Sequence, residues 1–600
     1  MPDPDRPSLL LRLLPPIDST AYHILLGCVA IFILGPLGGI SAAFMNFSIG
    51  FFIGGQVLAG ILGSTITLGY GPAGKHGANY MQTMAASVAG MFGMAVLIQA
   101  RYWLGLPEVA VWQLILYYVC IGMFGVGLGM VYTPILVDRM QLAFPSGLAV
   151  ANILRALTDK NLLKRSVAKL GGGVLIGYVG GLASSIMPAV EALGISTSTL
   201  GAGMIVGARI ALPALVVAEI GDALRPHLVA IGWLEPGAPF RKIGFIVALG
   251  TILGAAIVDV GLILVEAVRK LTAKDTPPAP PQEDWKRVNV FRLVSWVVFW
   301  GVAVAVTGHV VLGEPMRYLL ICIGLAFLFV LINGISQGIS DSNPISSAFV
   351  MTVFILAAVG LTDAGTGLMC ASILLIACSE GGDMQQDRST GWRLGTNRII
   401  QFRYQVIGIA FGAVLAVVLA KVFLNAYPVL KVDQFGHHVE GAQHWQSAMT
   451  YKFVGALRGI TTSQPHIMTA LRLGVLIGLC TEVARKLLKR ARRYRDWARV
   501  STAGKVFDFF IDAFLLPSPY ASSFGGFVEL NTCYWWAGGG ALGSLYETAV
   551  AWVNAKRGKA ADAGVPSDMS TTSLVGGGLI AGDSLAALSI GVIGLLKTVL

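Results

Sequence analysis

Long apolar stretches separated by short polar ones run through almost the whole chain. About 20 apolar residues are enough to cross the hydrocarbon core of a bilayer as one helix. Before residue 270 such stretches begin near residues 21, 47, 79, 109, 144, 166, 199 and 239, the one near 144 being short and irregular. After residue 290 they begin near residues 291, 316, 344, 364, 401, 466, 503, 533 and 570, and we expect one of these to be re-entrant or merged with a neighbour. The pattern predicts an all-α polytopic membrane protein with about 16 transmembrane helices in two eight-span halves, with broken or re-entrant helices.

A proline-rich segment divides the chain almost in the middle. Residues 270–289 carry several charges and the run P-P-A-P-P, a composition typical of a linker. The first 20 residues contain acids and prolines and lack the basic start of a signal peptide, so we expect no cleaved leader. The predicted organisation is an N-terminal cytoplasmic segment (1–20), a first transmembrane half (21–269), a cytoplasmic linker (270–290) and a second transmembrane half (291–600) with an extracytoplasmic insertion (427–464).

The composition supports a membrane protein. Of the 600 residues 55% are hydrophobic and 12% are charged, whereas about 25% of a soluble domain is charged. Mean hydropathy is +0.72. So few charges cannot cover a soluble surface, and we expect a multi-pass protein of the plasma (inner) membrane. The 74 glycines favour helices that approach one another closely.

Basic residues indicate which segments face the cytoplasm. Residues 485–499 contain eight lysines and arginines beside a predicted span, and the positive-inside rule places such a run in the cytoplasm. Residues 556–559 fall on the same side. The basic residues between 160 and 165 would then lie outside, which predicts a half-helix or hairpin near residue 144. Nucleic-acid binding is the other explanation of a basic run, and a position beside a span makes it the weaker one.

Three features that often indicate a metal or cofactor do not do so here. The seven cysteines lie mostly in apolar segments without a CxxC pair, as packing residues do. Residues 69–76 nearly match a phosphate-binding loop, but His76 stands where Ser or Thr is required. His437, His438 and His444 lie in a polar segment, which favours a solvated loop over a metal site. We therefore expect no metal, no cofactor and no ATP-driven mechanism.

The densest group of polar residues lies between two apolar stretches. Residues 379–391 read S-E-G-G-D-M-Q-Q-D-R-S-T-G and include three carboxylates, an arginine and two glutamines. Charged groups at membrane depth are costly and normally line a cavity or a pathway. An ordinary cytoplasmic loop would also carry acids, arginine and glycine. The sequence thus predicts a polar loop here and leaves open whether it belongs to a substrate pathway.

Two prolines mark breaks at the start of apolar stretches. Asn343-Pro344 follows Asp341 and Ser342, and asparagine and proline suit the first positions of a helix. Plain capping explains this pair. The functional alternative is a broken helix whose N-terminus faces the pathway and favours an anionic group. Residues 144–147 (F-P-S-G) allow the same two interpretations.

Asn79, Tyr80, Gln82 and Thr83 place four polar side chains at the start of an apolar stretch. Uncharged hydrogen-bonding groups suit the recognition of peptide-like or chelate atoms, and helix–helix hydrogen bonding is the equally open alternative. These residues follow glycines in the first half, as residues 383–386 do in the second. Interrupted segments at corresponding places in two halves indicate a transporter site at a repeat interface.

Taken in order, these segments resemble the motifs of the oligopeptide transporter family, which includes the yellow-stripe-like metal-chelate carriers. Residues 343–391 are similar to its second-half signature, and residues 142–149 (L-A-F-P-S-G-L-A) to its first-half segment. Residues 81–83 and 464–466 resemble two further motifs. Metal-chelate members usually carry Glu-Asn where this chain has Gly77-Ala78, and we expect the second-half acids to replace that glutamate. The chain resembles a prokaryotic-type member.

The resemblance implies a secondary transporter, generally proton-coupled, that imports small oligopeptides or peptide-like metal chelates by alternating access, and not an enzyme. The expected partners are the bilayer and a small-molecule substrate, with no nucleic acid, and a homodimer is left open. The rivals are an ion-pumping, pyrophosphatase-like hydrolase, which needs clustered carboxylates with metal ions, and a passive channel. The candidate substrate-binding residues are Asn79, Tyr80, Gln82, Thr83, Pro145, Ser146, Asn343, Pro344, Gln385 and Gln386. The candidate proton-coupling residues are Asp341, Glu380, Asp383 and Asp387.

Overall fold

Helices make up almost all of the described chain in the computed structural model, and no strand occurs among the described residues. The all-α prediction is therefore confirmed for this part of the chain. The described residues are 14–48, 60, 63–64, 66–158, 160–187, 190, 196–272, 283–340, 343–433, 447–458, 465–527, 530–556 and 570–599.

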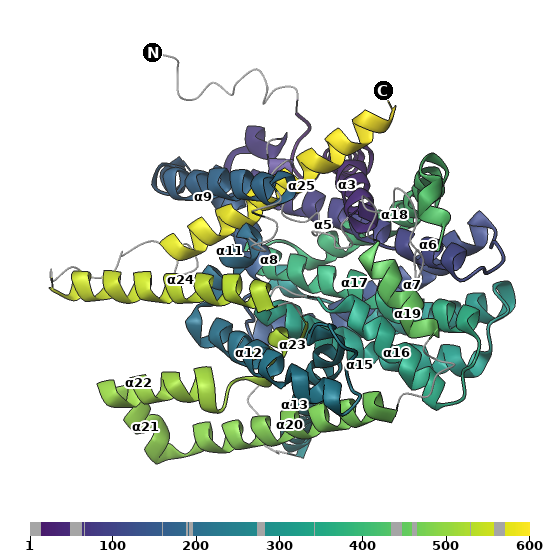
Figure 1. The fold of residues 1–600 in the computed structure, drawn as a ribbon. Helices are drawn as coiled ribbons and strands as arrows, with labels where there is room; N and C mark the ends of the chain where they lie inside the picture. Colours follow the sequence, from purple (N-terminus) through teal and green to yellow (C-terminus); the bar gives the residue numbers. More distant parts are fainter. Residues whose placement is uncertain are drawn as a thin grey trace, which may run out of the picture.

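Figure 1 labels the helices in chain order. The helices before the linker are α2 (Thr20–Val29), α3 (Gly35–Ser48), α5 (Gly74–Phe92), α6 (Ala95–Trp103), α7 (Val111–Thr133), η3 (Pro134–Arg139), α8 (Pro145–Thr158), α9 (Lys160–Ile186), α11 (Thr197–Val206), α12 (Ala208–Ala230) and α13 (Arg241–Thr272). Those after it are α14 (Val290–Val306), η5 (Thr307–Val311), α15 (Met316–Ser340), α16 (Ile345–Ala358), α17 (Ala364–Leu394), α18 (Arg398–Ala426), α19 (Ala448–Arg458), α20 (Pro465–Arg490), α21 (Arg492–Val500), α22 (Thr502–Phe510), η9 (Ile511–Leu515), α23 (Pro519–Phe527), α24 (Leu530–Lys556) and α25 (Thr571–Val599).

Seven helical stretches among the described residues are long and apolar enough to cross a membrane. They are Leu68–Trp103, Val111–Arg139, Asp284–Val311, Met316–Gly338, Ala364–Leu394, Arg398–Ala426 and His466–Arg490. The protein is therefore a multi-pass membrane protein, and about 16 spans stays a prediction. The proline-rich centre of the linker and most of the insertion, residues 434–446 and 459–464, lie outside the described residues.

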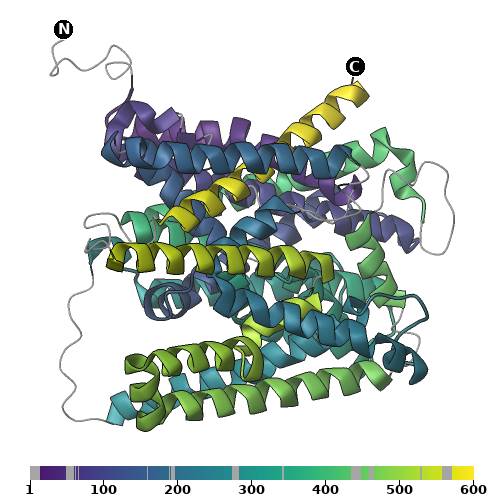
Figure 2. The same cartoon turned by 60° about the vertical axis from the view of Figure 1, so that its left-hand side comes forward.

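Helix α17 lies in the middle of the molecule (Figure 1). Helices α5, α7, α8, α15 and α16 pack around it. Figure 2 shows most helices running side by side, with α9 and α25 at one edge and α20 to α22 at the opposite edge. The polar stretch predicted from the sequence thus occupies the best-covered position in the protein.

Glycines bring helices from before and after the linker into backbone contact. A side chain on Gly173 of α9 would overlap the backbone oxygen of Val575 on α25, and one on Gly177 would overlap the backbone oxygen of Leu579. The contacts advance in the same direction along both helices, so α9 and α25 are parallel. Without a hydrophobic driving force between helices in lipid, small residues permit the close packing that holds them together.

The pair formed by α13 and α20 has the same construction. Gly250 and Gly254 of α13 face Gly474 and Gly478 of α20, and the two glycines on each helix are four positions apart. A Cβ on Gly250 would lie 2.5 Å from the carbonyl oxygen of Leu471. Glycines on α18 likewise allow α5 to pack closely against that helix. The high glycine content predicted close helix approach, and these pairs confirm it.

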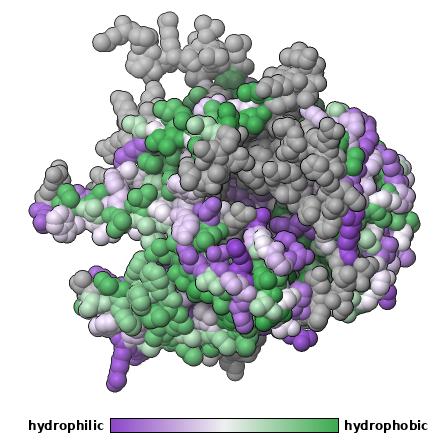
Figure 3. Space-filling view, viewed as in Figure 1, coloured by the Kyte–Doolittle hydropathy of each residue, from purple (hydrophilic) through white to green (hydrophobic). Residues whose placement is uncertain are grey.

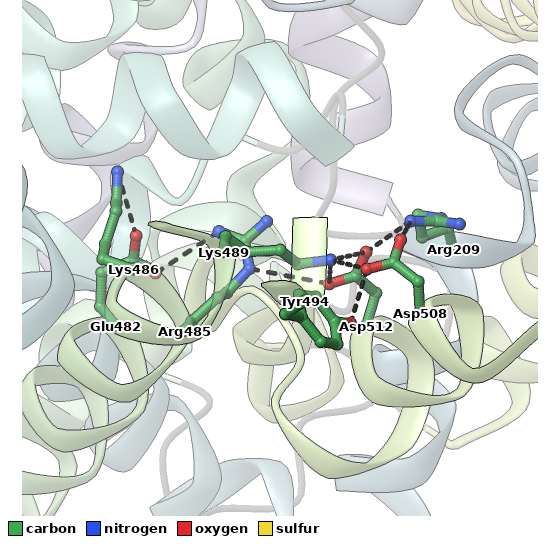
Figure 4. A network of polar contacts seen from close by, with 8 residues as sticks. All are labelled: Arg209, Glu482, Arg485, Lys486, Lys489, Tyr494, Asp508 and Asp512. Atoms are coloured by element: carbon green, nitrogen blue, oxygen red, sulfur yellow. Dashed lines mark hydrogen bonds and ion pairs between the residues drawn. The ribbon is translucent and has the colours of Figure 1, made fainter. Parts of the chain in front are cut away.

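An ion network joins α12 to the end of α20, to α22 and to η9 (Figure 4). Arg209 Nη1 lies 2.6 Å from Oδ2 of both Asp508 and Asp512. Lys489 forms ion pairs with the same two carboxylates, and Tyr494 donates to Asp508 at 2.7 Å. Part of the basic run is therefore neutralised within the protein and ties segments from both sides of the linker together.

The helices that carry this network also present an apolar surface (Figure 3). Leu476, Leu487, Val506, Phe507 and Phe510 are between 44% and 65% exposed. Exposed apolar surface of this kind marks contact with a membrane or a partner. In a multi-pass protein it is the expected lipid-facing side.

Glu314 lies in the turn between η5 and α15, outside the candidate spans. Burial raises the pKa of this carboxyl above its ordinary value, against the effect of a hydrogen bond from Thr366. The folded protein then holds the proton more tightly than the unfolded chain, so stability falls as pH rises above about 4. We expect the thermal midpoint of Glu314→Gln to depend less on pH between 4 and 7, and to exceed that of the wild type at pH 7. Parallel midpoint curves for the two proteins would contradict this.

Candidate functional site

The polar stretch at residues 379–391 is helical and buried within α17. The prediction that it forms a loop between spans is therefore wrong. The helix begins where Asp363 accepts a hydrogen bond from the N–H of Thr366 at 2.6 Å, and it ends at Gly395 with φ 71°. A helix satisfies its own backbone, so surrounding helices need to supply partners only for its side chains.

The glycines that suggested a loop serve instead as points of close approach. A Cβ on Gly381 would lie 2.7 Å from the side chain of Val330, and one on Gly382 would overlap Gln337 and Asn343. The glycines therefore let α15 and the start of α16 reach the middle of α17, where polar groups are concentrated.

Three carboxylates share one face of α17, because Glu380, Asp383 and Asp387 are spaced by three and four residues. This face meets α5, where Gln82 Nε2 donates to Asp387 Oδ1 at 2.9 Å. A Cβ on Gly90 would lie 2.9 Å from Asp383 Oδ2 and 3.0 Å from Glu380 Oε1. Gly90 thus leaves the space that the acids occupy, and all three acids are buried.

A chain of amide hydrogen bonds links these acids to α18. Asn79 Nδ2 donates to Gln82 at 2.8 Å, and Gln401 Nε2 donates to Asn79 Oδ1 at 2.6 Å. Gln401 also donates to the backbone oxygen of Asp387 at 3.1 Å and accepts from Arg388 Nη1 at 2.5 Å. Three helices therefore meet in one buried polar cluster, which we call the central cluster.

The neighbours of Asn79 on α5 are placed differently. The Thr83 hydroxyl donates to the backbone oxygen of Asn79 at 3.0 Å, within its own helix. Tyr80 stacks on Tyr404 with ring centroids 5.3 Å apart, and His23 lies 6.3 Å away. Of the predicted residues on α5, Asn79 and Gln82 contribute to the central cluster, whereas the Tyr80 ring belongs to a neighbouring aromatic group.

Gln385 and Gln386 face α15 from another side of α17. Gln337 Nε2 donates to Gln386 Oε1 at 2.8 Å. A side chain on Gly334 would overlap Gln385, whose amide lies 3.5 Å from the backbone oxygen of Val330. These two predicted residues are therefore buried, and both contact α15.

The predicted break at Asn343-Pro344 separates α15 from α16. Asn343 Nδ2 donates to the backbone oxygen of Cys378 at 2.9 Å, and Asn333 donates to Asn343 Oδ1 at 3.0 Å. Pro344 is buried and directly precedes α16. The break therefore contacts α17 two residues before Glu380. Asp341, predicted for proton coupling, lies outside the described residues.

The second predicted break lies before α8. Phe144 has φ 43°, and its N–H bonds to the end of α15 at 2.8 Å. Pro145 begins the helix and, like Ser146, is buried. Thr390 of α17 donates to the backbone oxygen of Gly147 at 3.0 Å. This break contacts the same central helix as the first, twelve residues further along.

Several buried polar atoms have no hydrogen-bond partner among the described residues. They are both carboxylate oxygens of Glu380, Asp387 Oδ2, Gln385 Oε1, and Nε and Nη2 of Arg388. Buried polar groups are nearly always paired, with protein or with ordered water. The central cluster therefore has unused capacity for donors and acceptors from a ligand, a proton or water.

Sequence reasoning missed Gln401, Gln405, Gln337 and the part that Arg388 takes in the cluster. Gln405 Nε2 donates to the backbone oxygen of Glu380 at 3.2 Å. A signal was available, because Gln401 and Gln405 are four residues apart within an apolar stretch and so share a helix face. Polar residues with that spacing in a span point toward protein and not toward lipid.

Buried carboxylates, amides and an arginine in the middle of a multi-pass helical protein define a membrane transport protein. The sequence model described as "OPT oligopeptide transporter protein" matches residues 17–221 and 269–593. The chain therefore belongs to the OPT oligopeptide transporter family, whose members are transporters and not enzymes. No curated protein matches the chain. The family assignment excludes the ion-pumping hydrolase.

Proposed function

We propose that the protein is a proton-coupled importer of small oligopeptides in the plasma membrane, working by alternating access. The contact between Gln82 and Asp387 is the observation that carries this proposal. It joins, inside the protein, two motifs that the sequence placed in different halves. A carrier site at the interface of two halves requires that polar residues from both halves contact each other.

The three acids on α17 are the proposed coupling groups. A charged carboxylate that is buried without a partner is costly, and binding a proton removes that cost. Glu380 best fits the description, because both of its oxygens lack a hydrogen-bond partner among the described residues. In the proposed cycle the acids take up protons from the outside together with the peptide and release them inside.

The two helix breaks are the proposed points of movement. Residues near Asn343 and Phe144 sit where one helix ends and another begins, and both contact α17. Segments at helix ends absorb changes in backbone angle that a continuous helix resists. Movement at these breaks would open the buried cluster toward one side of the membrane and then toward the other.

The amide groups of Asn79, Gln82 and Gln401 suit the peptide bonds of a substrate, because an amide both donates and accepts hydrogen bonds. Metal chelates with peptide-like polar atoms remain the second substrate class. Among the described residues no three His, Cys, Asp or Glu side chains are grouped so as to hold a metal ion, so we expect any metal to travel bound to its chelator.

The proposal is tested by uptake of labelled tripeptides into proteoliposomes under an imposed pH gradient. We expect saturable accumulation when the outside is acidic, and none in liposomes without protein. Uptake that ignores the gradient would exclude proton coupling. Absence of uptake for every peptide and chelate would exclude the substrate claim, and non-saturable flux would indicate a channel.

Gln82→Met is expected to lower peptide uptake at least tenfold, because it removes two of the hydrogen bonds of the central cluster, each worth about 1 kcal/mol. Gln99→Met is the matched control. Gln99 is equally buried but bonds to Leu430 and Ser447, away from the cluster. Equal losses in the two variants, at equal protein yield, would mean that Gln82 matters only for folding.

A further inference from the structure

Arg388 is a buried arginine with unused hydrogen-bonding groups. It is 1% exposed, and its Nη1 donates to Gln401 at 2.5 Å. The Nε and Nη2 atoms of Arg388 have no acceptor among the described residues. Arg388 also forms no ion pair with any of the described residues. A buried charge without a partner is strongly unfavourable, so the conformation described here leaves an interaction of Arg388 unmade.

In the two nearest arginines along the chain both terminal nitrogens have acceptors, which shows that the surroundings can supply them. Arg398, also buried, donates to both carboxylate oxygens of Asp138, one of them at 2.8 Å. Arg393 donates to the backbone oxygens of Ser389 at 3.0 Å and Ala143 at 2.8 Å. Arg388 differs from both because it points into the central cluster.

The groups around Arg388 hold it in place without neutralising it. Gln401 accepts from one end of the guanidinium and donates to Asn79, which donates to Gln82. Asp387 directly precedes Arg388 in the chain, and its Oδ1 already accepts a hydrogen bond from Gln82. When a proton occupies Asp387, the guanidinium is the remaining charge at this end of the cluster.

A guanidinium with adjacent free N–H groups binds a carboxylate in a two-point arrangement that other side chains do not reproduce. We propose that Arg388 binds a carboxylate of the transported substrate, anchoring it in the central cluster when the helices open. This inference rests on the proposed function and adds the chemical group that the site selects. The carboxylate is the C-terminus of a peptide or an acid group of a metal chelate.

The test compares Ala-Ala-Ala with its C-terminal amide as competitors of labelled Ala-Ala-Ala uptake in proteoliposomes. A hydrogen-bonded pair with a charged group changes affinity by about 10- to 100-fold, and we expect the amide to compete that much more weakly in the wild type. In Arg388→Gln the acid and the amide should compete equally, because the glutamine has no charge to distinguish them. In Arg388→Lys the ratio between competition by the acid and competition by the amide should lie between those of the wild type and Arg388→Gln.

The acid-to-amide ratio separates substrate binding from a structural role. If Arg388 only stabilised the fold, Arg388→Gln would weaken both peptides alike and keep the ratio. Arg393→Gln is the control on the same helix, and its ratio should equal that of the wild type. Peptide-induced shifts of the thermal midpoint give the same ratio for a variant that binds without transporting.

Competition by an iron(III) nitrilotriacetate complex identifies the source of the carboxylate. Stronger competition by this chelate than by the peptide, lost in Arg388→Gln, would assign the site to chelates. A wild type that transports peptides but accepts acid and amide equally would overturn this inference and leave the proposed function intact. A wild type that transports neither peptide nor chelate would overturn the proposed function and this inference with it.

Discussion

Replacing Glu380 with glutamine is expected to abolish the accumulation of peptide against its gradient while exchange of peptide across the membrane continues. With one proton per peptide, a difference of one pH unit supports about tenfold accumulation, and the variant should show none. Glutamine has nearly the shape of a protonated glutamate but cannot release a proton. The site is therefore held in the form that binds peptide and is no longer driven by the gradient.

The measurement uses two assays on the same proteoliposomes. Uptake under an imposed pH gradient reports coupling, and exchange of labelled for unlabelled peptide without a gradient reports binding and movement. Glu482→Gln is the matched control, because Glu482 is also buried but pairs with Lys486 at 3.3 Å on α20. Gradient-driven accumulation that survives in Glu380→Gln would remove Glu380 from the coupling mechanism and leave Asp383 and Asp387 as candidates.

Replacing Gly177 with leucine is expected to prevent α9 from packing on α25. A Cβ at this position already overlaps the backbone of Leu579, and backbone cannot move aside as a flexible side chain can. Overpacking costs about 1–3 kcal/mol where side chains can adjust, and we expect roughly the upper end of that range or more here. Thermal midpoint and the monodisperse fraction in detergent measure the effect.

Gly172 provides the control on the same helix. A Cβ there would meet no atom within 4 Å, so Gly172→Leu should fold with a thermal midpoint close to that of the wild type. Both substitutions replace glycine with the same helix-favouring, apolar residue, and only the contact with α25 differs. Similar midpoints for the two variants would show that the glycine contact does not hold these helices together.

The helical class and the family could be predicted from the sequence, because each depends on patterns along the chain. Apolar runs indicated membrane helices, and ordered motifs indicated the transporter family that the family match confirms. The polar stretch at residues 379–391 was located correctly but predicted to be a loop. Its glycines look like breakers in a local pattern, whereas in the protein they admit neighbouring helices to α17.

Arg388 shows why part of the site could not be predicted. In the sequence it is one charged residue among several in a polar segment, and nothing there separates it from Arg393 or Arg398. Its difference lies in what surrounds it, since Asp138 and the carbonyl of Ala143 pair with the other two from distant parts of the chain. Which buried charge is left without a partner depends on every helix that packs nearby.

The sequence alone determined that this chain enters the membrane many times and which polar groups go with it, because hydropathy and motif order are read along the chain. Only the tertiary structure decided that Gln82 and Asp387, 305 positions apart, share a hydrogen bond. Residues 379–391, which the sequence predicted to be a loop, form part of the central helix α17 in the folded protein. The physical reason is that a buried charge acquires its role from the helices around it, and helix packing is a property of the whole fold.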